Sequence, residues 1–476
     1  MAYQTALLPA FSGVRMDICE GLMKPDASPN ACNVDTRSGG LTLAGGFTRT
    51  VPAAIETITP VERAYVYATE HGNRYLAAAR DMLYLYNETA GFWQTLYGFG
   101  RSVSGERIDF LKVRNGTADR LLITCGGETM QAFDAETGRI EPFGSEQKAS
   151  GACLSYCELY FGRLFAAGDP QAPSRLYWSK APGGGRTIDD WRSDPASENV
   201  SGGYVDVGVD DDPITGVFAL SNQLLIFKRD SLYRLLGDRP ANYRIVSVDA
   251  AFRQPIHTAC VRYADRLFFL TDGGLYFYDG QTVRRSPAFR AIEPLLTDAD
   301  LGGVRSAACG DTLYFAIRSR HDAPYNDVVI EYDVLRDRYM LRKGFTVADF
   351  CTVHGELYAL TGDGTLVRFD GNNSYDGARI DAYWETPLLD LGRKDANKTL
   401  LRLTVCGEGR LRVTVSADGG SFETTVRLST VPNSVTEIPL RAVGRVFRIR
   451  IGNVDGGALR LDAPVTLLYD QQRRPE

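Results

Sequence analysis

Short apolar runs, separated by turns that contain Gly or Asp, repeat along most of this 476-residue chain. Each unit has an apolar strand, a second strand rich in Leu, Tyr and Phe, a turn, and a third strand that ends in an aromatic residue followed by Asp or Asn. Turns of the Asp-Gly or Gly-Gly kind supply the positive φ angles of two-residue β-hairpins. The pattern therefore predicts antiparallel strands. The clearest copies are residues 266–280 (RLFFLTDGGLYFYDG), 356–371 (ELYALTGDGTLVRFDG), 120–134 (RLLITCGGETMQAFD) and 74–87 (RYLAAARDMLYLYN).

Looser copies at residues 163–179, 223–236 and 312–333 bring the number of units to about seven. Most are about 45 residues apart, which is the period of four-stranded propeller blades. One small sheet cannot cover both of its faces, whereas seven sheets stacked radially bury a shared core and leave only short edges. We therefore predict an all-β chain with a β-propeller of about seven blades at residues 57–371. Two ordinary β-sandwiches are the alternative.

Helical periodicity is confined to residues 289–301, where Ile292, Leu295 and Leu296 predict a short inserted helix. Tyr (24), Phe (22) and Gly (48) are plentiful, which suits strands joined by tight turns. The helix is therefore expected as an insertion in a β-rich chain.

The two ends of the chain follow other patterns. Residues 1–56 are rich in Gly and Pro and have little periodicity, so we expect an extended arm that lies on another surface, with a final strand that completes a blade. A disordered terminus is the alternative. A boundary falls near residues 372–377, and residues 372–476 then alternate apolar with basic or Thr positions. Such alternation predicts a β-sandwich with jelly-roll character. Its expected strands are residues 400–405, 411–415, 446–451 and 459–461.

The charge balance bears on the class of partner. The net charge is −6, basic residues are scattered, and the few clusters, such as Arg284–Arg285 and Arg473–Arg474, are short. A nucleic-acid binder of this size is usually basic overall or carries a basic stripe, so direct nucleic-acid recognition is not expected. A basic channel wall formed only in an oligomer stays open. The start of the chain has no secretory signal pattern, and no apolar run approaches the roughly 20 residues that span a bilayer.

Cysteine and histidine indicate no metal site. The odd number of cysteines, and their position in apolar runs, predict reduced core residues made in a cytosol. Only one pair is close in sequence, Cys153 and Cys157, and its spacing is not C-x-x-C. The nine cysteines are Cys19, Cys32, Cys125, Cys153, Cys157, Cys260, Cys309, Cys351 and Cys406, and the four histidines are His71, His257, His321 and His354.

Three motifs were tested as chemical sites. Residues 416–422 (SADGGSF) come close to the Ser-x-Asp-x-Gly-x-x-Trp turn of sialidase-like propellers, but the Trp is missing, and we expect a hairpin turn whose Asp caps backbone amides. The acidic run at residues 210–212 is followed by Pro213 and is expected in a solvated loop between blades. Residues 183–185 (GGG) precede no Gly-Lys-Ser/Thr. We therefore predict no catalytic, cofactor-binding or metal-binding residues, and no enzyme.

Three segments together resemble the propeller hub or nozzle proteins of phage tails. The first is residues 28–41 (SPNACNVDTRSGGL), with Gly45, Gly46 and Phe47 after it. The other two are residues 225–237 (LIFKRDSLYRLLG), followed by residues 243–245, and residues 383–392 (YWETPLLDLG), followed by Lys398 and residues 415–422. The order of these segments along the chain matches an arm, a propeller and a sandwich.

The resemblance implies a structural virion protein, placed in the tail hub, the nozzle or a neck-to-tail ring and assembled in the host cytoplasm. Copies would form a cyclic homo-oligomer, with six as a guess, beside adjacent tail or neck proteins and around DNA in transit. The arm and the exposed sheet edges suit contacts between copies, and an acidic ring would let DNA slide. The alternatives are a carbohydrate-binding or glycoside-cleaving propeller that acts on the host surface, and a cellular propeller scaffold.

Overall fold

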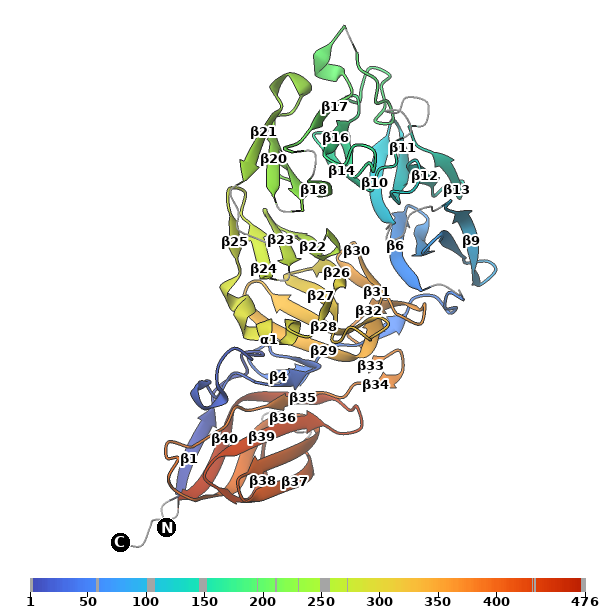
Figure 1. Ribbon diagram of the computed structural model, residues 1–476. Coiled ribbons are helices and arrows are strands. Elements are labelled where there is room, and N and C mark those ends of the chain that lie inside the picture. The colour runs from blue at the N-terminus through green and yellow to red at the C-terminus, as the bar shows by residue number, and fades with distance from the viewer. Residues whose placement is uncertain are drawn as a thin grey trace.

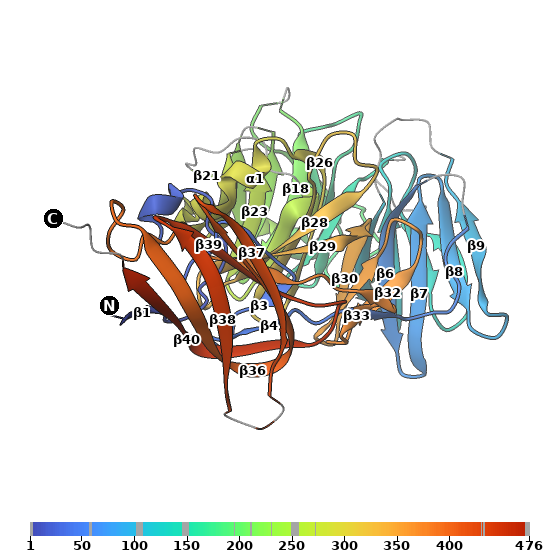
Figure 2. The same ribbon diagram turned by 90° about the horizontal axis from the view of Figure 1, so that it is seen from below.

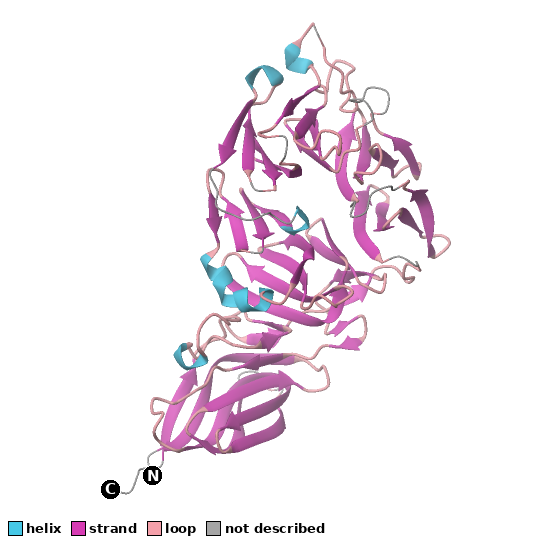
Figure 3. Cartoon of the chain, in the orientation of Figure 1, coloured by secondary structure: helices cyan, strands magenta, loops and turns pink. Residues whose placement is uncertain are grey.

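The computed structural model describes residues 3–56, 60–100, 108–144, 152–194, 196–209, 212–229, 231–248, 257–271, 273–429, 431 and 434–471. Its strands form a ring of seven small sheets and one larger sheet next to the ring (Figure 1). Helices occur only as short pieces in the described part of the chain (Figure 3). The predicted fold class, an all-β chain with a seven-bladed propeller and a sandwich, is confirmed.

Six blades are continuous in sequence, and each is a four-stranded antiparallel meander. The first three are blade one, with β6 (Val61–Thr69), β7 (Gly72–Ala79), β8 (Met82–Asn87) and β9 (Phe92–Gly98); blade two, with β10 (Asp109–Asn115), β11 (Ala118–Thr124), β12 (Gln131–Asp134) and β13 (Arg139–Pro142); and blade three, with β14 (Tyr156–Tyr160), β15 (Arg163–Ala167), β16 (Arg175–Trp178) and β17 (Gly203–Asp206). The next three are blade four, with β18 (Ile214–Leu220), β19 (Gln223–Lys228), β20 (Leu232–Leu236) and β21 (Arg244–Val248); blade five, with β22 (Cys260–Tyr263), β23 (Arg266–Thr271), β24 (Gly274–Tyr278) and β25 (Val283–Arg285); and blade six, with β26 (Asp300–Cys309), β27 (Thr312–Arg318), β28 (Asn326–Asp333) and β29 (Arg338–Val347).

The repeating unit of the sequence is the hairpin formed by the second and third strands of a blade. Residues 266–280, for example, contain β23 and β24, which pair in register from Leu267↔Tyr278 to Thr271↔Gly274. The first strands lie at the centre of the ring (Figure 1), and the hydrophobic core lies between neighbouring blades. Between blades one and two, for example, Leu76 packs with Leu121 and Phe133.

Blade seven is completed by a strand from the N-terminal arm, which precedes blade one in the sequence. Its strands β30 (Asp349–Val353), β31 (Glu356–Leu360) and β32 (Leu366–Phe369) are followed by β5 (Phe47–Arg49), which pairs antiparallel with β32. Two short strands, β33 (Ser374–Tyr375) and β34 (Ala378–Arg379), extend this sheet. Phe47 is buried against Phe345, Phe369 and Tyr375, with ring centroids 5.1, 5.4 and 4.9 Å away. The predicted completion of a blade by the arm is confirmed.

The rest of the arm pairs with the C-terminal part of the same chain. Four arm strands join the large sheet: β1 (Tyr3–Leu8) and β4 (Leu41–Leu43) pair with β40 (Leu459–Gln471), β3 (Val34–Asp35) pairs with β4, and β2 (Ala31–Cys32) pairs with β35 (Tyr383–Glu385). The surface on which the arm lies is therefore its own chain. The 3-10 turn η1 (Glu20–Leu22) lies between β1 and β2.

The C-terminal sheet is built around one long strand, β36 (Lys398–Ala417). Its first half pairs with β38 (Val435–Gly444) and β40, and its second half pairs with β37 (Gly420–Arg427) and β39 (Phe447–Asn453). The expected strands at residues 400–405 and 411–415 are therefore two halves of a single strand, which passes from one layer of the sandwich to the other. Register shifts in its pairings accompany this bend, as β-bulges do. The result is a nearly closed, barrel-like sandwich (Figure 2).

The propeller and the sandwich share one hydrophobic cluster, which continues from blades five and six through the arm into the sandwich. Phe11 of the arm contacts Trp384 of β35 edge-on at 5.2 Å. Asn33, in the left-handed region at φ 57°, donates from Nδ2 to the carbonyls of Lys343 and Asp381 at 3.1 and 2.8 Å and accepts from the Lys343 amide at 2.9 Å. The arm therefore joins the last strand of blade six to the segment that enters the sandwich.

The predicted helix is present as a turn of 3-10 helix, η5 (Pro287–Ile292), followed by α1 (Glu293–Leu296). It connects blades five and six, and Ile292 is buried. Three further 3-10 turns are η2 (Glu198–Val200), η3 (Pro240–Asn242) and η4 (His257–Ala259).

Candidate functional site: an ion network at the propeller axis

Charged side chains from the first strands of several blades meet near the centre of the ring. Asp109 and Asp349 are the first residues of β10 and β30, and Arg63 of β6 lies between their carboxylates. The Arg63 Nη2–Asp109 Oδ1 distance is 3.1 Å, and the Arg63 Nε–Asp349 Oδ2 distance is 3.2 Å. Arg305 of β26 lies on the other side of Asp349, with Nε 3.6 Å from Oδ1. Blades one, two, six and seven are thereby connected.

His257 brings a fifth blade into this network. It begins η4, just before β22, and its Nε2 lies 3.5 Å from Asp109 Oδ2. Its ring packs against Tyr156 and Phe218, with centroids 4.6 and 4.9 Å away. Gly216 makes room for it, because a Cβ there would lie 2.4 Å from His257 Nδ1. Any side chain at position 216 would therefore clash with the His257 ring in its present position.

Ion pairs and backbone amides hold the carboxylates of this network in fixed positions. Burial would lower the pKa of Arg63, but Asp349 and Asp109 hold that pKa above its ordinary value. Backbone amides add to the fixation, since Ala64 donates to Asp349 Oδ2 and Phe110 to Asp109 Oδ1, both at 3.0 Å. The arrangement suits blade-to-blade fixation.

A second ion pair spans the axis between blades three and five. Glu158 of β14 is buried and contacts Arg262 of β22. Burial lowers the pKa of Arg262. At the end of the axis marked by Asp109 and Asp349, charged side chains from five blades therefore meet, among the residues described.

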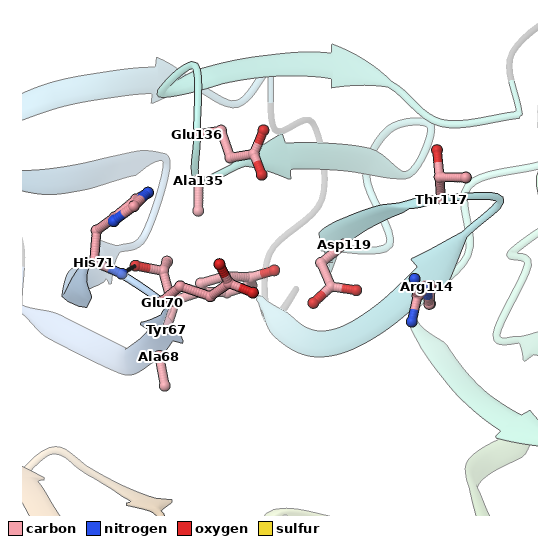
Figure 4. Close-up of a pocket in the computed structure, with 10 residues that line it drawn as sticks. Tyr67, Ala68, Glu70, His71, Arg114, Thr117, Asp119, Ala135 and Glu136 are labelled. Atoms are coloured by element: carbon pink, nitrogen blue, oxygen red, sulfur yellow. Dashed lines mark hydrogen bonds between the residues drawn. The ribbon is translucent and has the colours of Figure 1, made fainter.

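A hollow of about 260 Å³ lies between blades one and two. Figure 4 shows the carboxylates of Glu70 and Glu136, which lie in turns, and of Asp119, which lies in β11, with Arg114 nearby. Lys112 lies near this hollow, 4.6 Å above the Tyr67 ring and 3.7 Å from Asp119. The hollow is polar and carries both signs of charge. Throughout the described ranges, no group of three or more His, Cys, Asp or Glu side chains is placed to hold a metal ion.

Three buried cations are satisfied by backbone carbonyls. Lys228 Nζ donates to the Val209 carbonyl at 2.8 Å, and Lys398 Nζ donates to the carbonyls of Ala396 and Arg445 at 3.0 and 2.8 Å. Arg163 Nη1 donates to two carbonyls in the same way. Burial lowers the pKa of Lys398 and of Arg163. These cations fix loops, and sequence reasoning missed that role although a lone lysine ends the apolar run at residues 224–228.

The motifs tested in the sequence have structural roles where the structure describes them. Asp212 lies in the segment between blades three and four, and it accepts hydrogen bonds from the Arg229 amide and the Ser231 hydroxyl, both at 2.8 Å. Residues 210 and 211 lie outside the described residues. Residues 183–185 form an exposed turn. In residues 416–422 a hairpin joins β36 to β37, as expected, and Asp418 accepts from the amide of Arg445, which lies outside this hairpin, at 2.7 Å.

The expected burial of the cysteines holds only in part. Cys32, Cys125 and Cys351 are buried, and burial raises the pKa of Cys32 to about 11 and that of Cys351 to about 12. Cys19 is exposed, so the prediction is wrong there, because the arm leaves it on the surface near η1. The remaining five are half-buried: Cys153, Cys157, Cys260, Cys309 and Cys406.

Fold and ion network together define a β-propeller protein with an appended β-sandwich. No family model matches the chain, and no curated protein matches it. Within the described ranges, no helix is long and apolar enough to cross a membrane.

Among solved structures, the chain is similar to Raptor of Chaetomium thermophilum (TM-score 0.45, 9% identity), covering 68% of this chain and only 29% of Raptor's. It is also similar to a chain of the mitotic checkpoint complex (TM-score 0.42, 11% identity, 68% of this chain and 96% of that one). A third is BamB of Moraxella catarrhalis (TM-score 0.38, 11% identity, 76% and 97%). At these values the likeness assigns neither a family nor a function.

Proposed function

We propose that this chain is a structural component of a phage particle, with copies arranged as a ring in the tail hub, the nozzle or the neck-to-tail junction. The observation that carries the proposal is the position of the three segments that resemble tail hub proteins. Residues 28–41 contain β2, β3 and Asn33, which join the arm to both domains. Residues 225–237 contain the buried Lys228, and residues 383–392 contain β35 with the buried Trp384. Two of the three segments, residues 28–41 and 383–392, therefore lie where the two domains join, and residues 225–237 lie within blade four.

The architecture suits a subunit that bears load. One hydrophobic cluster runs through the propeller, the arm and the sandwich, so the two domains are packed as a unit. The charged groups at the axis serve to connect blades, and we propose no catalytic role for them. Because charged side chains of five blades meet at the described end of the propeller axis, we expect the DNA passage to lie between copies of the chain. The partners would be further copies and adjacent tail or neck proteins.

Particles of the phage that encodes the chain test this proposal. Mass spectrometry of gradient-purified particles should detect the chain in a fixed ratio to the capsid protein, and immunogold labelling should mark the tail. A host cytosolic protein measured in the same fractions controls for carry-over. Detection of the chain in the lysate but not in purified particles would overturn the proposal.

One observation favours a second candidate function, carbohydrate binding at the host surface. The hollow between blades one and two presents Glu70 and Glu136 from two turns and Asp119 from β11, and carboxylates can accept hydrogen bonds from sugar hydroxyls. A glycan array would test it, with the double variant Glu70→Gln and Glu136→Gln as the matched control. Binding lost in that variant would support the candidate, and no binding by the unmodified protein would dismiss it.

A further inference from the structure

The first strand of the chain lies at an open edge of the sandwich. Among the described residues, β1 pairs only with β40, in an unbroken register from Tyr3↔Asp470 to Leu8↔Val465. Figure 2 shows β1 at the margin of the sandwich. Along its other side, alternate backbone N–H and C=O groups therefore point away from the sheet, which is a template for adding a strand.

The strand lacks the features that normally protect such an edge. Proteins keep edges from pairing with charged residues, proline or β-bulges. The β1 sequence, YQTALL, contains no charge and no proline, and its pairing has no register shift. In blade one, the pairing of β9 with β8 carries a register shift. Most other edge strands contain charges: β13 has Arg139 and Glu141, β17 has Asp206, β21 has Arg244, β25 has Arg284 and Arg285, β34 has Arg379, β37 has Glu423 and Arg427, and β38 has Glu437 and Arg441. The edge strand β18 contains no charge, but its pairing with β19 carries a register shift, and the uncharged edge strand β2 is only two residues long.

The outward face of β1 is apolar at its two ends. Side chains alternate along a strand, so Tyr3, Thr5 and Leu7 share one face, and Leu8 on the opposite face is buried. Tyr3 is 64% exposed and Leu7 is 56% exposed. Leu468 of β40, which pairs with Thr5, continues this face into the sheet. Large apolar side chains at an unprotected edge indicate a surface that is covered in some state of the protein.

We propose that β1 is a contact between two copies of this chain, paired antiparallel about a two-fold axis at Thr5. In this register Tyr3 lies opposite the partner's Leu7, Thr5 opposite the partner's Thr5, and Leu7 opposite the partner's Tyr3. The two most exposed apolar side chains of the strand then cover each other twice, as favourable aromatic–aliphatic cross-strand pairs. The sheets of the two sandwiches become continuous across the contact.

The contact is small and closes after two copies. Six residues from each side bury far less than the roughly 1,600 Å² of a standard interface, so we expect a dissociation constant of about 10–100 µM. A two-fold contact is complete in the dimer, whereas a ring needs head-to-tail contacts. The inference thus stands apart from the proposed virion ring, and the purified chain tests it without particles.

Complementary charges at the paired positions test the contact and its register. The variant Tyr3→Glu/Leu7→Glu should remain monomeric in sedimentation velocity at concentrations where the unmodified chain dimerises, and so should Tyr3→Lys/Leu7→Lys. Mixing the two should restore the dimer, because each introduced glutamate would face an introduced lysine. Both positions are exposed, so each variant should keep the unmodified circular dichroism spectrum. A monomeric unmodified chain at about 1 mM, or a mixture that stays monomeric, would overturn the proposal.

Cross-linking tests the position of the axis. In a Cys19→Ser background, Thr5→Cys places two thiols directly opposite each other, with Cα atoms about 4.5–5.5 Å apart, within reach of a disulfide. The matched control Gln4→Cys leaves its two copies about 8 Å apart, beyond that reach. Mild oxidation should link Thr5→Cys and not Gln4→Cys into dimers on a non-reducing gel. Equal cross-linking of both variants, or of neither, would contradict the assigned register.

Discussion

Truncation of Phe47 to alanine tests the closure of the propeller by the arm. Phe47 is 3% exposed, and among the described residues its strand β5 is the strand of the arm that pairs within blade seven. Removing a buried Phe side chain from a core costs about 3–5 kcal/mol. Three ring contacts, with Phe345, Phe369 and Tyr375, are lost together, so we expect a loss near the upper end, about 4 kcal/mol.

Urea unfolding followed by circular dichroism measures this loss. The control is Phe92→Ala, because Phe92 is 52% exposed at the outer strand of blade one and its removal should cost less than about 1 kcal/mol. If β5 closes the ring, Phe47→Ala should lower the midpoint of the propeller transition well below that of the control. Equal midpoints for the two variants would refute the closure.

Three further changes test other parts of the structure. Asn33→Ala removes the hydrogen bonds to Lys343 and to Asp381 and should lower the free energy of unfolding by about 3 kcal/mol. Calorimetry should then resolve separate transitions for the propeller and the sandwich, and a single unchanged transition would contradict the role of Asn33 in joining them. Gly216→Ala should cost about 2 kcal/mol in urea unfolding because its Cβ meets His257, and His257→Ala should restore most of that loss; additive losses would contradict the clash. Asp190→Asn should lower the free energy of unfolding by about 1 kcal/mol at pH 7, because the ion-paired hydrogen bond from Arg192 holds the Asp190 pKa well below its ordinary value. This stabilisation is complete above the unfolded pKa of about 3.9, so the stability difference between the two proteins should shrink as the pH falls below about 4. A difference that stays constant with pH would contradict this explanation.

The blades could be predicted because their information is local. In residues 266–280 both strands and their turn lie within one short segment, so alternation and turn residues identify the hairpin without distant contacts. The same holds for the hairpin at residues 416–422. Seven such hairpins at a regular period then imply the ring.

The joints between domains could not be predicted because their partners are distant in sequence. Completion of a blade by the end of the arm was expected, but the pairing of Tyr3 with Asp470 depends on which edge is free after the rest has folded. Nothing in the alternation of a short strand encodes that edge. The arm was expected as an extension over another surface, and the identity of that surface became clear only from these pairings.

The ion network was missed for a related reason. Asp109, His257 and Asp349 belong to three blades, and each looks like an ordinary polar residue at the start of a strand or loop. Their proximity follows from the equivalent position of first strands around the ring. The signal that could have found the network is a charged residue at or near the first strand of several blades. Aligning the repeats by the hairpin of the second and third strands does not compare these first-strand positions.

Electron cryo-microscopy of the intact particle tests the central claim most directly. A reconstruction of the tail should contain several copies of the propeller and its sandwich, related by rotation around the tail axis, with the DNA passage between copies. The arm strand β5 should close blade seven within each copy. A tail map whose density is fully explained by other chains, at a resolution where strands are separated, would contradict the account.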